Sequence, residues 1–108
     1  MPKKIEIPFN KWSKERLYDE RKIGTTRNKK YGEVGDWFEV IFLDKDESRK
    51  YQLIKVTKTK LISVRDFASK AEGCNNGEEF EKVWKQIHPK KGFVPNQQVW
   101  YHGFRELD

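Results

Sequence analysis

The segment DWFEVIFL, residues 36–43, carries the strongest strand signal in the chain, because aromatic and β-branched side chains dominate it. Its apolar side chains alternate between two faces, with Phe38, Val40 and Phe42 on one and Trp37, Ile41 and Leu43 on the other. Since both faces are apolar, the pattern predicts a central or barrel strand. The polar turn DKDES follows it, and residues 49–60 (RKYQLIKVTKTK) are expected to form its antiparallel partner.

Two further strands and the first two helices are expected on either side of this hairpin. Alternation in residues 5–9 (IEIPF) predicts a short first strand, and residues 98–107 (QVWYHGFREL) predict the last one. Asn10 is expected to cap a helix over residues 11–21. Ser63 and Asp66 have the spacing of a capping box and predict a second short helix over residues 63–73.

A third helix has the clearest periodicity. Asn76 and Glu79 repeat the capping spacing, and Pro89 marks the end of the helix. Apolar residues at helical spacing form one face: Phe80, Val83, Trp84 and Ile87. The order of elements has no βαβ rhythm, so we expect one α+β domain over residues 1–108, a small, mostly antiparallel β-barrel with three short helices packed around it.

Composition is that of a small protein with a core of large rings. Only 35% of residues are hydrophobic, but they include 7 Phe, 4 Tyr and 4 Trp. The single cysteine, Cys74, excludes an internal disulfide framework. The opening MPKKIEIP is too polar for a signal peptide, and no run is long enough to span a membrane. A cytoplasmic protein with no membrane contact and no obligate protein partner is expected.

Positive charge is concentrated near the N-terminus. The net charge is +6, and residues 1–30 hold ten Lys or Arg against four acidic residues, so that this third of the chain carries the whole excess. Such asymmetry indicates an anionic partner such as RNA, or else a solvated basic surface. No metal or cofactor is expected, because His88, His102 and Cys74 lack the spacing of a zinc site and no phosphate-binding glycine loop follows a strand.

The stretch RKIGTTR, residues 21–27, places unlike chemical groups side by side in a predicted loop. Lys22 is a flexible cation, whereas Arg27 offers a planar fork for phosphate or carboxylate. Thr25 and Thr26 add hydroxyls, and Gly24 allows close approach of the backbone. By itself the stretch fits either a solvated loop or a site.

The order of features along the chain resembles the ASCH domain family. The family pattern of a Lys followed five residues later by an Arg matches Lys22 and Arg27, and its Gly-Asp before the second strand matches residues 35–36. Glu72 before Gly73 and the helix sequence EEFEKVW, residues 78–84, also fit. The resemblance runs from about residue 5 to 107. One position departs from it, since the family's glycine two residues before the Lys is Glu20 here.

The resemblance implies a PUA-like barrel and two kinds of activity. Some small bacterial ASCH proteins are amidohydrolases that remove acetyl from N4-acetylcytidine with a Lys, a Thr and a Glu, which match Lys22, Thr25 and Glu72. Lys22 would act as base toward the Thr25 hydroxyl, and Glu72 would protonate the leaving amine. Arg27 would orient the substrate or bind its oxyanion.

Other ASCH relatives are proposed to bind or cleave RNA, so the family does not decide the activity. RNA binding, amidohydrolysis and ribonuclease activity therefore stay open, with RNA or a modified nucleoside as the partner. The cleft is expected between residues 21–31 and Glu72. Its predicted substrate-binding residues are the cations Arg21, Arg27, Lys29 and Lys30, and the aromatic residues Trp12 and Tyr31.

Overall fold

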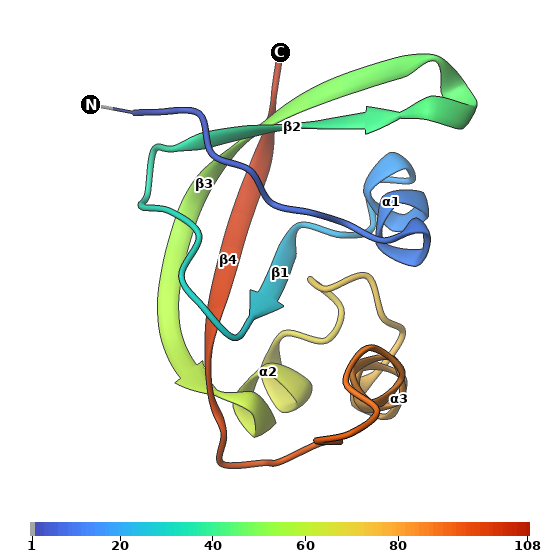
Figure 1. The fold of residues 1–108 in the computed structure, drawn as a ribbon, viewed down its shortest axis with the longest axis vertical. Helices are drawn as coiled ribbons and strands as arrows, with labels where there is room; N and C mark the ends of the chain where they lie inside the picture. The colour runs from blue at the N-terminus through green and yellow to red at the C-terminus, as the bar shows by residue number, and fades with distance from the viewer. Residues whose placement is uncertain (1) are drawn as a thin grey trace.

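A curled antiparallel sheet organises the molecule. The computed structural model describes residues 2–108, in which four strands pair in the order β1 (Gly24–Arg27), β4 (Gln98–Leu107), β3 (Glu47–Lys60) and β2 (Trp37–Phe42). The long strands β3 and β4 cross the whole molecule, and the sheet bends around them into a half-barrel (Figure 1). The expected α+β class, the antiparallel hairpin and the last strand are confirmed.

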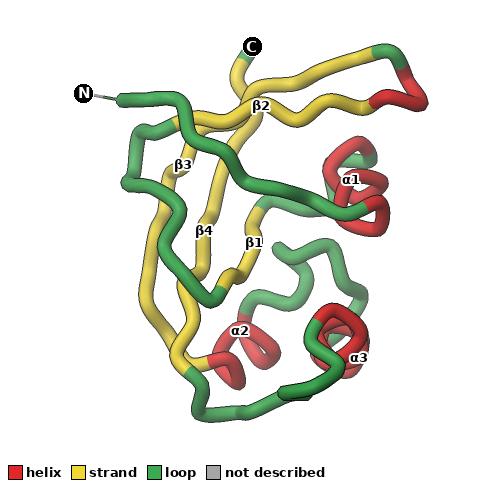
Figure 2. Tube along the Cα trace, in the orientation of Figure 1, coloured by secondary structure: helices red, strands yellow, loops and turns green. Residues whose placement is uncertain are grey.

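The expected number of α-helices is also confirmed: α1 (Lys11–Tyr18), α2 (Leu61–Phe67) and α3 (Gly77–Ile87). In Figure 2 all three lie to the right of the long strands β3 and β4, and α2 packs against both strands and against α3. A single 3₁₀ turn, η1 (Leu43–Lys45), connects β2 to β3. None of the helices within residues 2–108 combines the length and the apolar character that crossing a bilayer requires.

Two of the three expected caps are formed. The backbone amide of Ser13 donates to Asn10 Oδ1 at 2.9 Å, and that of Glu79 donates to Asn76 Oδ1 at 2.9 Å. The prediction of a capping box at Ser63 is wrong, because α2 already begins at Leu61 and has no side-chain cap. Leu61 is fully buried, so tertiary packing and not a local cap decides where this helix begins.

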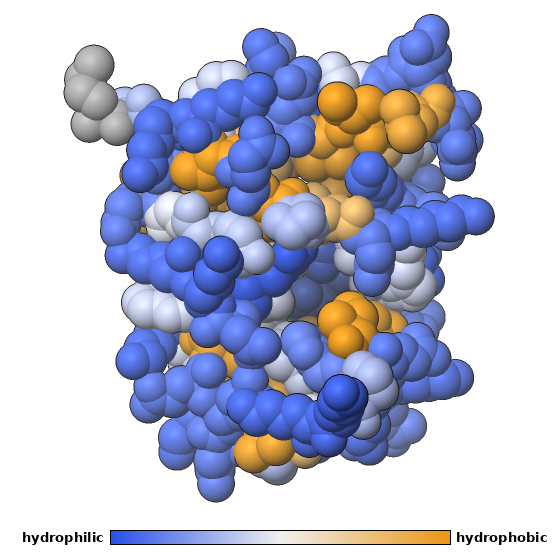
Figure 3. Space-filling model, viewed as in Figure 1, coloured by the Kyte–Doolittle hydropathy of each residue, from blue (hydrophilic) through white to orange (hydrophobic). Residues whose placement is uncertain are grey.

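The buried side chains form two clusters. The first gathers around Phe38, whose ring contacts Tyr51 and Phe104 at centroid distances of 5.4 and 5.3 Å. The second joins α2 and α3 to β4 through Leu61, Val64, Cys74, Phe80, Trp84 and Val99. Outside these clusters the surface is mainly hydrophilic, with separate hydrophobic patches (Figure 3).

Three strand predictions are corrected by the sheet. Residues 5–9 form no strand; Lys4 makes an isolated bridge to Trp37, although Ile5 and Ile7 are buried. The stretch predicted as a loop contains β1, which exists because Gly24 pairs with Gly103, 79 positions away in the chain. The segment over residues 37–42 is an edge strand and not a central one, which explains why Ile41 is 55% exposed.

The turn after α1 delivers the chain to the candidate site. The amide of Arg21 donates to the carbonyl of Arg16 at 2.9 Å and that of Glu20 to Leu17 at 3.1 Å, the two bonds of a Schellman motif. Its left-handed position is Glu20, with φ of 62°. The family's glycine is therefore absent, but the backbone conformation that favours glycine is kept.

Replacing Glu20 with glycine is expected to raise the free energy of unfolding by about 0.5–1 kcal/mol, because the left-handed strain of a residue with a Cβ exceeds the entropy that glycine loses. Asp19→Gly is the matched control, since Asp19 has φ of −80° and should lose stability on the same change. Urea unfolding followed by circular dichroism measures both. Equal shifts in the two variants would contradict the role assigned to Glu20.

Candidate functional site

A cavity of about 700 Å³ opens between β1, α3 and the segment that leads into α1. Polar residues from two segments that are distant in the sequence line one part of it: Lys22, Thr25, Thr26, Arg27 and Glu72. Apolar residues line the rest, chiefly Phe9, Trp12, Phe80, Val83, Trp84 and Ile87. The predicted face of the third helix therefore has two roles, because Phe80 and Trp84 belong to the core and also form the cavity wall.

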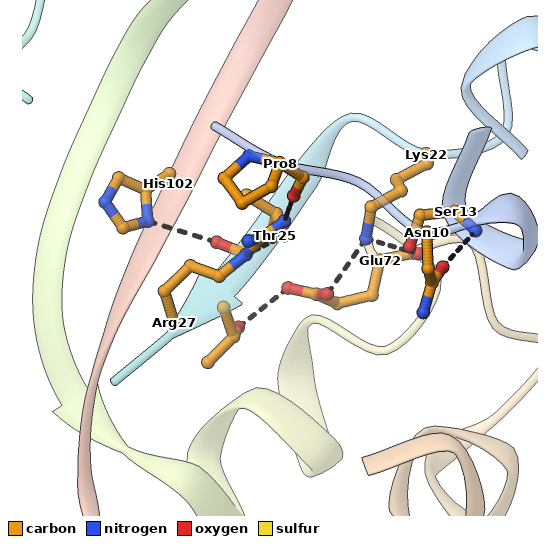
Figure 4. Close-up of polar contacts among 9 residues, drawn as sticks. Pro8, Asn10, Ser13, Lys22, Thr25, Arg27, Glu72 and His102 are labelled. Carbon is orange, nitrogen blue, oxygen red and sulfur yellow. Dashed lines mark hydrogen bonds and ion pairs between the residues drawn. The ribbon is translucent and has the colours of Figure 1, made fainter. Parts of the chain in front are cut away.

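Lys22 and Glu72 form a buried ion pair in this cavity. Lys22 Nζ donates to Glu72 Oε1 at 3.2 Å and to the Glu72 carbonyl at 3.1 Å, and the two side chains are 3% and 7% exposed. The Thr26 hydroxyl donates to the other carboxylate oxygen at 2.7 Å. Figure 4 shows Lys22 and Glu72 pointing toward one another beside β1. Two buried opposite charges and a hydroxyl are thus joined in one network.

Backbone contacts hold the two halves of this network together. The amides of Ile23 and Gly24 both donate to the carbonyl of Ala71, at 2.7 and 3.0 Å. Gly73, directly after Glu72, has φ of 95°, a conformation that residues with a Cβ rarely adopt. The chain can therefore turn immediately after Glu72 and leave its carboxylate facing β1.

Arg27 lies on the same strand and points into the cavity. Its Nε donates to Thr25 Oγ1 at 3.1 Å and its Nη2 to the Pro8 carbonyl at 2.6 Å (Figure 4). The guanidinium lies 5.0 Å from the Phe9 ring centroid. Burial lowers the pKa of Arg27, which indicates a cation removed from much of its solvent.

His102 contacts the backbone of β1 and of the segment that follows it. The amide of Tyr31 donates to His102 Nε2 at 3.0 Å, so this nitrogen accepts, and Nδ1 faces the Thr25 carbonyl at 3.3 Å, so that nitrogen carries the hydrogen. The ring is fully buried, and burial is the main cause that lowers its pKa, with Arg27 adding to it. A neutral, fully buried His102 therefore ties the segment after β1 to the carbonyl of Thr25.

Tyr101 was not predicted as a site residue but lies against the network. A Cβ added to Gly24 would meet its hydroxyl oxygen at 2.1 Å, so Gly24 is required for a close approach of this ring. Burial raises the pKa of Tyr101 to about 12, with the charge of Glu72 as a second cause. The glycine in the middle of RKIGTTR was the local signal for such an approach, but it could not name the ring that approaches.

The structure brings most of the predicted site residues together. Those that line the cavity are Lys22, Thr25, Glu72, Arg27, Lys29, Tyr31 and Trp12. Arg21 and Lys30 do not. Arg21 donates to Gly73 and Asn75 outside the cavity, and Lys30 forms an ion pair with Glu33.

Other reactive side chains contribute differently. His88 is the C-cap residue of α3, and its ring packs on Trp84 at a centroid distance of 4.2 Å. Cys74 is buried, and burial raises its pKa to about 11, so its thiol stays protonated at neutral pH. Within residues 2–108, no three His, Cys, Asp or Glu side chains gather closely enough to hold a metal ion.

Comparisons with known proteins bear on the fold. No protein-family model matches the sequence, and no curated protein matches it. An ASCH domain from Lactobacillus crispatus has a TM-score of 0.67 and 11% identity, over 96% of this chain and 78% of that one. A DUF984-family protein from Enterococcus faecalis has a TM-score of 0.65 and 18% identity, over 100% of this chain and 77% of that one. The chain therefore has the fold of an ASCH domain, as its resemblance to that family predicted.

Proposed function

We propose that this protein is a small hydrolase that binds an acylated nucleoside in the cavity and removes the acyl group from its exocyclic amine, with N4-acetylcytidine as the substrate to test. The observation that carries the proposal is the buried Lys22–Glu72 pair, which accepts a hydrogen bond from the Thr26 hydroxyl and faces a ligand-sized cavity that Thr25 also lines. Buried ionisable groups in a concave site are costly, and such groups cluster where proteins perform chemistry.

The partners of the basic residues favour a small ligand over a polymer. Of the cations expected to bind substrate or RNA, Lys30 pairs with Glu33 and Arg21 lies outside the cavity, and the neighbouring Lys22 is buried against Glu72. They do not form a continuous track along which a phosphate backbone would run. Trp12 and Tyr31 provide rings at the cavity for a planar base.

The reaction proceeds through a covalent ester in this proposal. Thr25 Oγ1 attacks the amide carbonyl and its proton passes to the Glu72 carboxylate. The C–N bond then breaks while Glu72 returns the proton to the leaving nitrogen, which yields cytidine and an acetyl ester of Thr25. Water attacks the ester by the same route through Glu72, and acetic acid leaves with Thr25 regenerated.

Lys22 has a different role here from the one that the sequence resemblance implied. Its Nζ is engaged by both the side chain and the carbonyl of Glu72, so the proposal makes Glu72 the base and Lys22 the residue that positions it. Thr26 holds the second carboxylate oxygen. Arg27 donates to the Thr25 oxygen and stabilises negative charge that develops there.

The test is release of cytidine and acetate from N4-acetylcytidine, followed by absorbance and by chromatography of both products. We expect equal amounts of the two products from the wild-type protein, and none from Thr25→Val purified in the same way. A trapped acetyl ester on Thr25, seen by mass spectrometry, would support the covalent route. No turnover by the wild-type protein would reject N4-acetylcytidine deacylation as its function.

A further inference from the structure

The cavity carries more positive than negative charge. Its ionised lining residues are three cations, Lys22, Arg27 and Lys29, and one carboxylate, Glu72. Lys22 and Glu72 neutralise each other across 3.2 Å. Two cations, the half-buried Arg27 and the exposed Lys29, then have no ion-pair partner of their own within residues 2–108.

Both of these cations lie near the same aromatic ring. The Arg27 guanidinium is 5.6 Å and the Lys29 ammonium 4.8 Å from the same ring centroid, that of Tyr31. Neither cation forms an ion pair within residues 2–108, whereas the neighbouring Lys30 pairs with Glu33. Like charges on one ring repel each other unless an anion lies between them.

Arg27 also has unused hydrogen-bond donors. A guanidinium has five N–H groups. Within residues 2–108, Arg27 donates to Thr25 Oγ1 and to the Pro8 carbonyl, and the nearby Tyr31 side chain also favours its charged form. Burial lowers the pKa of Arg27, because the fold has removed solvation from the charged guanidinium. An anion bound to the remaining N–H donors would compensate for that lost solvation.

We infer that Arg27, Lys29 and Tyr31 form a phosphate subsite, and that the natural ligand of the cavity is a nucleotide monophosphate and not a neutral nucleoside. This inference rests on the proposed function and extends it to the substrate class. A phosphate monoester carries a charge of about −1.5 to −2 at pH 7, which matches the two unpaired cations. Its oxygens suit the planar fork of Arg27, and the exposed Lys29 supplies a point charge at the mouth.

Binding of the reaction product tests the subsite without any need for turnover. Calorimetry at low salt should show cytidine 5′-monophosphate binding at least about tenfold more tightly than cytidine, a difference of about 1.4 kcal/mol. Lys29→Ala should remove most of that preference. Lys30→Ala changes the same charge one residue away and should leave the preference intact, because Lys30 is outside the cavity and paired.

Two outcomes would overturn the inference. Equal affinity for cytidine and its monophosphate would show that the unpaired cations hold no phosphate. Tighter binding of an oligocytidylate, weakened equally by Lys29→Ala and Lys30→Ala and steeply dependent on salt, would indicate an RNA surface instead. Selective binding of the monophosphate without any deacylation would overturn the proposed reaction but support the phosphate subsite, so the two failures are distinguishable.

Discussion

Replacing Lys22 with methionine is expected to lower the free energy of unfolding by about 3–5 kcal/mol, because the change leaves the Glu72 carboxylate buried without its cation. Methionine keeps most of the length of the lysine stem, so the loss reflects charge more than packing volume. Among residues 2–108, the Thr26 hydroxyl alone would still donate to the carboxylate. Chemical unfolding followed by tryptophan fluorescence measures the effect.

A double-mutant cycle separates the ion pair from its surroundings. Glu72→Gln keeps an oxygen for Thr26 but removes the charge, so Lys22→Met combined with Glu72→Gln should be far more stable than the sum of the single losses predicts. Lys85→Met is the matched control, because Lys85 forms an exposed pair with Glu81 and should change stability little. A small loss in Lys22→Met, equal to that in Lys85→Met, would show that the Lys22–Glu72 pair is not held together in solution.

Local sequence signals predicted the elements that local interactions determine. The face of α3 followed from helical spacing, and its cap at Asn76 followed from a side chain three residues from its partner. The last strand, Gln98–Leu107, was predicted with its exact bounds because its residues are intrinsically suited to a sheet. Strand β1 was missed since a four-residue segment is fixed as a strand by its partner and not by its own composition.

The site also combines features that the sequence predicts with contacts between distant residues that it does not predict. Lys22, Thr25 and Glu72 were found through their order along the chain, and all three line the cavity. The contact of Thr26 with Glu72 and the approach of Tyr101 to Gly24 had no counterpart in the sequence, because they join positions 46 and 77 residues apart. Composition located the basic stretch. It counted charges but could not show which of them have an acidic partner in the fold.

Glu72→Gln is expected to lower kcat for N4-acetylcytidine by about 10²–10⁴-fold, an increase of about 3–5 kcal/mol in the barrier, because the amide neither accepts nor returns a proton. The amide is nearly isosteric and still has an oxygen for the Thr26 hydroxyl. Affinity for cytidine should therefore be unchanged, which calorimetry checks at a temperature where circular dichroism shows the variant to be folded. Glu78→Gln is the matched control, since Glu78 is exposed and outside the cavity.

The comparison with Lys22→Met decides which member of the pair moves the proton. If Glu72 is the base, Lys22→Met should retain part of the activity wherever the variant is folded, because the carboxylate is still present although less well held. If Lys22 is the base, as the sequence resemblance implied, Lys22→Met should be the more damaging change and Glu72→Gln the milder one. Wild-type turnover by a folded Glu72→Gln variant would contradict the proton route proposed for Glu72 and return that role to Lys22.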